Sequence, residues 1–168
     1  MFTRRACVIS ILAVVSVGLS FAAKNDERSF EGKWKLDKKR LDQSAKAPAE
    51  LEQRLRMKGS KLIIESKYEE PESGLYPLHW LGVMTYRFEL NTDGSETVNF
   101  IGPFRHESKT TIEGNRMTTD WNAGIENGTA NGQWIRTLSP DGKEMNLQVK
   151  GKASDGRIID STLVFFRR

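Results

Sequence analysis

Cysteine and histidine are both scarce in this sequence. Its single cysteine, Cys7, lies in an apolar segment at the N-terminus, and the 168 residues include two histidines. If the N-terminal segment is removed, the rest of the chain has no thiol that could form a disulfide, hold zinc or attack a substrate. The remaining chain, about 145 residues long, must therefore be stabilised by packing, and this length is sufficient to bury a core without covalent crosslinks.

Catalytic and metal-binding motifs are absent as well. The sequence contains no His-x-His, His-Glu-x-x-His, Gly-x-Ser-x-Gly or phosphate-cradling glycine motif. His79 and His106 could act with Asp120 as general acids or bases, since histidine titrates near neutral pH, but nothing in their spacing brings the three residues together. We therefore expect a protein that is not an enzyme, and we predict no metal and no cofactor.

Charge of one sign is not concentrated anywhere along the chain. Lys and Arg number 26 and Asp and Glu 22, which gives a formal net charge of +4. Two of the basic residues, Arg4 and Arg5, belong to the N-terminal segment, so without them 24 basic residues face 22 acidic ones and the net charge is +2. No block of Lys and Arg alternates with aromatic residues, and nucleic acid is therefore not expected as a partner.

The N-terminal segment, residues 1–22, has the three parts of an export signal. Arg4 and Arg5 precede the apolar stretch from Ala6 to Leu19, and Ser20-Phe21-Ala22 then offers small residues where a signal peptidase needs them. We expect cleavage there, which leaves no membrane span and places the mature protein in a periplasm or outside the cell. The alternative is a retained signal-anchor helix, because the apolar stretch is only slightly shorter than the roughly 18 to 20 residues that span a bilayer.

The mature chain, residues 23–168, is expected to form one all-β domain. Apolar and polar residues alternate with a period of two after residue 29, and Asp-Gly and Asn-Gly turns interrupt the alternation at short intervals. About eight or nine strands joined by local hairpins follow from this pattern, and local connections favour an antiparallel up-and-down β-barrel over a sandwich. Expected strands include Phe30–Leu36, Met84–Leu90, Met117–Trp121, Trp134–Leu138 (with Trp134, Arg136 and Leu138 on one face), Met145–Val149 and Ile158–Phe166.

Two segments depart from the alternation. Pro48 to Met57 is predicted to be a short helix between the first two strands, with proline near its start and Leu51 and Leu55 on one side. Such a helix can close one end of a barrel. The segment from Glu69 to Leu81 is predicted to be a loop, because it contains two prolines and a glycine beside large apolar residues.

The start of the first strand resembles a family signature. Gly32-x-Trp34 is similar to the first signature of the lipocalins and the wider calycin superfamily, and Gly32-Lys33-Trp34-Lys35-Leu36-Asp37 resembles the opening of small secreted lipocalin-like proteins of bacteria. Thr119-Asp120-Trp121 is similar to the second signature. The resemblance implies a barrel whose tryptophan packs across the closed end beneath an arginine, here Arg167 or Arg136. The chain departs from the family in its predicted helix, its missing disulfide and the long spacing from Asp120 to Arg167.

An eight-stranded barrel is either filled by its own side chains or holds one small ligand. Methionine and aromatic side chains that point inward would form an adaptable apolar pocket. The alternative is that these residues simply pack the core. The predicted lining consists of Met84, Tyr86, Phe88, Phe100, Met117, Trp121, Trp134 and Met145.

The predicted function is to bind a small apolar or amphipathic molecule without converting it chemically. The alternative is an interaction module that docks on another exported protein, or inhibits it, through the loop at residues 69–81. In that case Tyr76, Leu78 and Trp80 would supply the anchoring side chains that dominate many interfaces.

Overall fold

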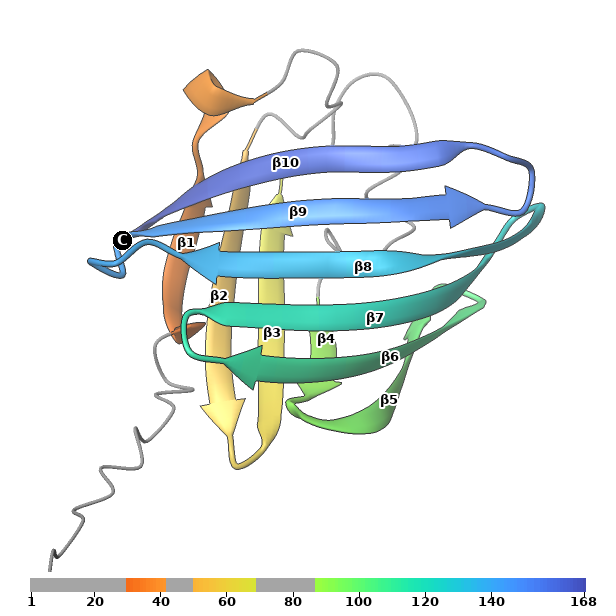
Figure 1. Ribbon diagram of the computed structural model, residues 1–168, viewed down its shortest axis with the longest axis horizontal. Helices are drawn as coiled ribbons and strands as arrows, with labels where there is room; N and C mark the ends of the chain where they lie inside the picture. The colour runs from red at the N-terminus through yellow and green to blue at the C-terminus, as the bar shows by residue number, and fades with distance from the viewer. Residues whose placement is uncertain (1–29, 42–49, 69–86) are drawn as a thin grey trace, which may run out of the picture.

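The structure, a computed structural model, describes residues 30–41, 50–68 and 87–168. Within these ranges ten strands form one antiparallel sheet that curls into a nearly closed barrel (Figure 1). A 3-10 helix, η2 (Lys38–Arg40), follows the first strand. No helix in the described ranges is long and apolar enough to cross a membrane. The strands are β1 (Gly32–Leu36), β2 (Leu51–Lys58), β3 (Lys61–Tyr68), β4 (Arg87–Asn91), β5 (Asp93–Ile101), β6 (Phe104–Glu113), β7 (Arg116–Ile125), β8 (Gly128–Leu138), β9 (Glu144–Ala153) and β10 (Ile158–Arg167).

The sheet is an up-and-down meander. Its spatial order is β4-β3-β2-β1-β10-β9-β8-β7-β6-β5, so the first and last strands pair with each other and the remaining pairs are between sequence neighbours. In Figure 1, strands β6 to β10 cross in front of β1 to β4, and β5 lies at the lower right, next to β4. The buried apolar side chains of both groups of strands form one core. This arrangement confirms the predicted all-β antiparallel barrel, with ten strands in place of the eight or nine expected.

The two edges of the sheet, β4 and β5, are joined by side chains. The Asn99 amide nitrogen donates to the Glu89 carbonyl oxygen at 2.8 Å, and the Asn99 amide oxygen accepts from the Glu89 backbone nitrogen at 3.0 Å. The backbone nitrogen of Asn91 donates to the Thr97 hydroxyl at 2.7 Å. An asparagine side chain carries an N–H donor and a C=O acceptor, as the backbone does, so these contacts nearly close the barrel where the strand ladder stops.

The predicted helix at Pro48–Met57 is wrong, because the described part of this segment is strand β2, paired along its length with β3. Leu51, Gln53 and Leu55 are buried and alternate with more exposed neighbours, which is the period of a strand. Leu51 and Leu55 lie four positions apart, and this spacing puts two residues on one face of a helix or of a strand alike. The turn after β2 is tight because Gly59 adopts a φ of 64°, which glycine tolerates without strain.

Trp34 closes one end of the barrel. Its side chain is fully buried, and its indole nitrogen donates to the Phe30 carbonyl oxygen at 3.0 Å. Across the β1–β10 pairing Trp34 faces Arg167, and the guanidinium carbon of Arg167 lies 4.5 Å from the centre of the indole ring. A guanidinium over an indole face is held by packing and by attraction to the ring. Of the two arginines considered for this position, the structure places Arg167 there.

Backbone groups hold the Arg167 side chain in place. Its Nη1 donates to the Glu31 carbonyl oxygen at 2.8 Å, and its Nε donates to the Gly142 carbonyl oxygen at 2.9 Å. Gly32 provides the space for this arrangement, since a Cβ at that position would lie 3.3 Å from Arg167 Nη1, and its φ of 145° favours glycine. The glycine of the Gly32-x-Trp34 pair therefore allows the arginine to reach the tryptophan.

Candidate ligand site in the barrel interior

The barrel interior contains polar side chains as well as apolar ones. The buried polar positions that point inward from the sheet are Gln53, Ser66, His106, Ser108, Thr110, Thr119 and Arg136. Some of them bind one another: the hydroxyls of Thr110 and Thr119 are 2.9 Å apart, and Gln53 Nε2 donates to Ser66 Oγ at 3.2 Å. The others lie on β6 and β8 beside large aromatic rings.

Those rings surround His106. Its imidazole meets the edge of Phe88 at 4.8 Å between ring centres and stacks on Trp134 at 5.2 Å and on Trp121 at 6.0 Å. The two indoles also stack on each other, at 6.2 Å. With Arg136, these four residues are called the interior cluster below. They come from β4, β6, β7 and β8, so the cluster spans both groups of strands.

A pair of glycines on neighbouring strands leaves space for the Trp121 ring of the interior cluster. Trp121 of β7 lies opposite Gly132 of β8, which in turn lies opposite Gly151 of β9. A Cβ at Gly151 would come within 2.8 Å of the Trp121 ring, closer than real side chains approach one another. The indole of Trp121 therefore packs directly over the backbone of β9.

Arg136 is the charged member of the interior cluster. Its side chain is 1% exposed, and its guanidinium carbon lies 5.7 Å from the Trp134 ring centre. Neither Nε nor Nη1 has a hydrogen-bond partner among the residues that the structure describes. Burial lowers the pKa of the guanidinium to about 10, so the group remains protonated at neutral pH. A buried cation without a counter-charge is costly, and buried charges in proteins are normally paired.

His106 is fully buried as well, and neither ring nitrogen has a partner on another described residue. Burial lowers its pKa to about 4, so the imidazole is neutral at neutral pH and offers one donor and one acceptor. The indole nitrogens of Trp121 and Trp134 and the hydroxyl of Ser108 also lack partners within the described ranges. Most buried polar groups in proteins are hydrogen-bonded. Several buried donors without partners in the described ranges can therefore bind a group that is rich in acceptors, such as an anion.

The structure places five of the predicted lining residues in the core. Phe88, Met117, Trp121, Trp134 and Met145 are buried. Met84 and Tyr86 lie outside the described residues, as does the predicted docking loop at 69–81 with Tyr76, Leu78 and Trp80. That the five core residues contact a ligand remains a prediction.

Phe100 does not line the interior, contrary to the prediction. Its side chain is 65% exposed, whereas its neighbour Ile101 is buried. The register of β5 against β6 shifts between Asp93 and Glu96, and the alternation then directs Asn99 towards β4 instead of Phe100. A shift of one residue turns a whole strand over, so the sequence pattern alone could not assign the inward face of β5.

The acid–base combination considered from the sequence is not formed. His106 lies in the interior cluster, while Asp120 is exposed and accepts a hydrogen bond from Gln133 at 2.7 Å. His79 is outside the described residues. In the described part of the chain, no three His, Cys, Asp or Glu side chains are grouped so that they could hold a metal ion.

Arg136 is the functional candidate that sequence reasoning missed. The resemblance to lipocalins suggested Arg136 only as a possible partner for Trp34. The signal was its place on the same face as Trp134 and Leu138, and both of those residues are buried. An arginine between two core positions is an interior cation, and that alternation could have identified it.

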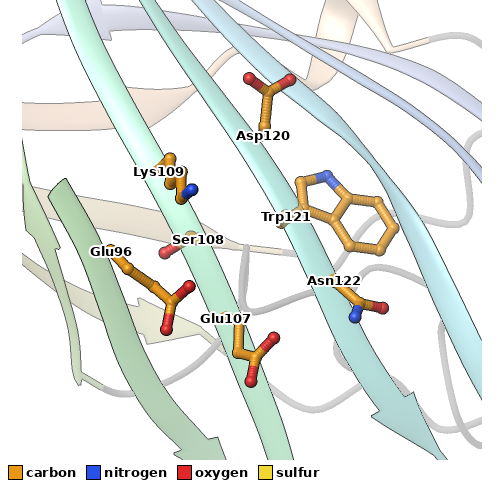
Figure 2. A pocket seen from close by; sticks show the side chains of 7 residues that line it. All are labelled: Glu96, Glu107, Ser108, Lys109, Asp120, Trp121 and Asn122. Carbon is orange, nitrogen blue, oxygen red and sulfur yellow. The ribbon is translucent and has the colours of Figure 1, made fainter. Parts of the chain in front are cut away.

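A hollow of about 240 Å³ lies over β5, β6 and β7 (Figure 2), lined by Glu96, Glu107, Ser108, Lys109, Asp120, Trp121 and Asn122. Two of its three carboxylates are already bound, since Arg105 donates to Glu107 at 2.7 Å and Gln133 donates to Asp120 at 2.7 Å. These charged groups belong to the hydrogen-bond network of the surface. The interior cluster, whose cation has no ion-pair partner in the described ranges, is the stronger candidate site.

No protein-family model matches the chain, and no curated protein sequence matches it. Solved structures match its fold. They share its up-and-down antiparallel β-barrel fold. The REP1-NXSQ fatty acid transporter matches with a TM-score of 0.51 at 13% identity, over 82% of this chain and 95% of that one. A secretory abundant heat soluble protein from Ramazzottius varieornatus matches with a TM-score of 0.52 at 12% identity, over 83% of this chain and 96% of that one. At such identities the likeness concerns the fold alone.

Proposed function

We propose that this protein binds an amphipathic molecule with an anionic head group, such as a fatty acid, inside the barrel and does not convert it chemically. The observation that carries the proposal is Arg136, a buried guanidinium whose Nε and Nη1 have no hydrogen-bond partner among the described residues. Hydrogen bonds from arginine to a carboxylate are charge-assisted and frequently bidentate. A ligand carboxylate would therefore supply both the missing acceptors and the missing counter-charge.

The apolar part of such a ligand has a suitable lining. Phe88, Met117, Trp121, Trp134 and Met145 are buried inside the barrel. Methionine and aromatic side chains adapt to irregular apolar shapes, and small-molecule sites are mostly apolar with a few polar groups. The name of one protein with the same architecture, a fatty acid transporter, agrees with this ligand class.

We propose further that residues 1–22 are a cleaved export signal and that the mature protein works in a periplasm or outside the cell. The basic and apolar parts of the segment support this proposal, as does the resemblance of the Gly32-Lys33-Trp34-Lys35-Leu36 opening to secreted lipocalin-like proteins of bacteria. N-terminal sequencing of the protein recovered from its native source tests it. A sequence that starts near Ala23 supports cleavage, and one that retains the apolar stretch supports the signal-anchor alternative.

The binding proposal is tested by comparing two probes of equal chain length, dodecanoate and dodecanol, by isothermal titration calorimetry. We expect the acid to bind more tightly to the wild-type protein. In Arg136→Met the affinity for dodecanoate should fall by about tenfold or more, because one charge-assisted hydrogen bond is typically worth that much. The affinity for dodecanol should change little. Arg116→Gln, which removes an exposed arginine on β7, is the matched control and should bind both probes as the wild type does.

Three outcomes contradict the proposal. Equal affinity of the wild type for acid and alcohol would show that the interior does not recognise the head group. Undiminished binding of the acid to Arg136→Met would assign recognition to another residue. No binding of either probe would favour a barrel filled by its own side chains.

A further inference from the structure

A second hollow, of about 530 Å³, lies along β1, β2, β3 and the start of β4, away from the interior cluster. Its volume is within the range of sites that take small molecules. Six of its lining side chains are charged. The four cations are Lys33, Arg54, Lys67 and Arg87, and the two carboxylates are Glu52 and Glu65, so the lining has a net charge of +2.

Strand register brings three of these cations together on the exposed face. Lys33 of β1 lies directly opposite Arg54 of β2. Arg54 lies opposite Glu65 of β3, and Lys67 lies opposite Glu52. Lys33, Arg54 and Lys67 are all exposed. Like charges directly opposite each other in a sheet are destabilising, so the Lys33–Arg54 pair does not contribute to the stability of the fold.

The two carboxylates of the hollow bind other cations. Glu65 accepts from Arg56 at 2.7 Å and lies 3.4 Å from the Arg87 guanidinium. Glu52 lies 2.9 Å from the Arg168 guanidinium. Each carboxylate thus pairs with the cation that faces it on one side, Glu65 with Arg87 and Glu52 with Lys35 at 3.8 Å. Neither forms an ion pair with the cation on its other side, Arg54 or Lys67.

Lys33, Arg54 and Lys67 consequently have no ion pair with any residue that the structure describes. Most other charged groups on the outer face of β1 to β4 are paired. A neutral residue at position 54 would remove the repulsion from Lys33 without breaking a contact.

We propose that Lys33, Arg54 and Lys67 form a binding site for a small ligand that carries a phosphate or sulfate group. The planar guanidinium of Arg54 can donate two parallel hydrogen bonds to such a group, and the two lysines act as flexible point charges beside it. This site is separate from the interior cluster and does not depend on the function proposed for it.

Isothermal titration calorimetry with inorganic phosphate at an ionic strength of about 0.15 M, where distant surface charges are screened, tests the site. Lys33→Gln combined with Arg54→Gln should weaken phosphate binding by about tenfold or more, since charge-assisted hydrogen bonds are lost. The matched control combines Lys150→Gln with Lys152→Gln, which removes the same charge from two exposed lysines on β9. This control variant should bind phosphate within about twofold of the wild type, because net charge alone contributes only weakly to binding. Denaturant unfolding should show the Lys33/Arg54 double variant to be at least as stable as the wild type, which excludes misfolding as the cause of lost binding.

Vesicles distinguish a free phosphate from a lipid head group. Binding of phosphatidylglycerol vesicles, with phosphatidylcholine vesicles as the neutral comparison, would identify a head group if the double variant loses it and the control keeps it. The proposal is overturned if neither phosphate nor anionic vesicles bind the wild type. It is also overturned if the double variant binds as the wild type does, or if both pairs of substitutions weaken binding equally.

Discussion

Two arginine–tryptophan pairs lie in this barrel, and their surroundings differ. At the closed end, Arg167 covers Trp34 at 4.5 Å and donates to two backbone carbonyl oxygens. In the interior, the guanidinium carbon of Arg136 lies 5.7 Å from the centre of the Trp134 ring, and two of its nitrogens, Nε and Nη1, have no partner among the described residues. The same two residue types therefore form hydrogen bonds to the backbone at one site and leave N–H donors without a partner in the described ranges at the other. Hydrogen-bond partners distinguish a structural arginine from a candidate ligand-binding one.

The largest loss of stability is expected when the tryptophan beneath Arg167 is removed. Trp34→Ala should lower the free energy of unfolding by about 3 to 5 kcal/mol, because a large buried side chain is lost and a cavity remains. Denaturant unfolding measures the change. Phe166→Ala, at a partly exposed position on β10, is the control and should cost much less. A loss below about 1 kcal/mol for Trp34→Ala would show that this residue does not close the barrel.

The second prediction concerns pH and the interior histidine. The folded-state pKa of His106, about 4, lies below the ordinary value of 6.5. As pH falls below 6.5 the unfolded chain takes up a proton at this residue before the folded chain does. Stability is therefore complete above pH 6.5 and is lost as the pH falls towards 4, by about 3 kcal/mol in total. Unfolding measured between pH 7 and 4 should show this loss.

His106→Leu is the control for that pH dependence, because it fills similar space without a titrating group. As the pH falls from 6.5 to 4, the wild type should lose stability steadily relative to the variant. Parallel pH profiles would mean that His106 is protonated at the same pH in both states, and therefore that it is not buried from water.

The third prediction is that replacing each of the two arginines by methionine changes stability in different directions. Arg136→Met should leave the unfolding free energy of the ligand-free protein unchanged or raise it by about 1 to 4 kcal/mol, since an uncompensated buried charge is removed. Arg167→Met should lower it by about 1 to 3 kcal/mol, because the Glu31 and Gly142 carbonyl oxygens lose their donor. Thermal or denaturant unfolding of the two variants side by side gives the answer. Changes of the same sign would show that the two arginines have the same role.

Local sequence pattern was sufficient for much of the fold. Alternating residues and Gly-containing turns predicted the all-β meander, and the resemblance of Gly32-x-Trp34 to the lipocalin signature implied a tryptophan beneath an arginine. The same pattern was not sufficient for the segment at 48–57, because Leu51 and Leu55 satisfy a helix and a strand equally well. The choice depends on pairing with β3, a contact that local periodicity does not specify.

Composition and short-range periodicity were enough to predict most strand-forming segments and the absence of thiol groups from residues 23–168, whereas the packing of Trp34 beneath an arginine was implied by the resemblance to lipocalins. The tertiary structure alone decided which side chains meet. The register shift in β5 turned Phe100 outward, the packing of β4, β6, β7 and β8 enclosed Arg136 among rings, and the pairing of β1 with β2 set Lys33 against Arg54. The physical reason is that register and burial are long-range properties, and a one-residue shift in pairing changes every contact along a strand.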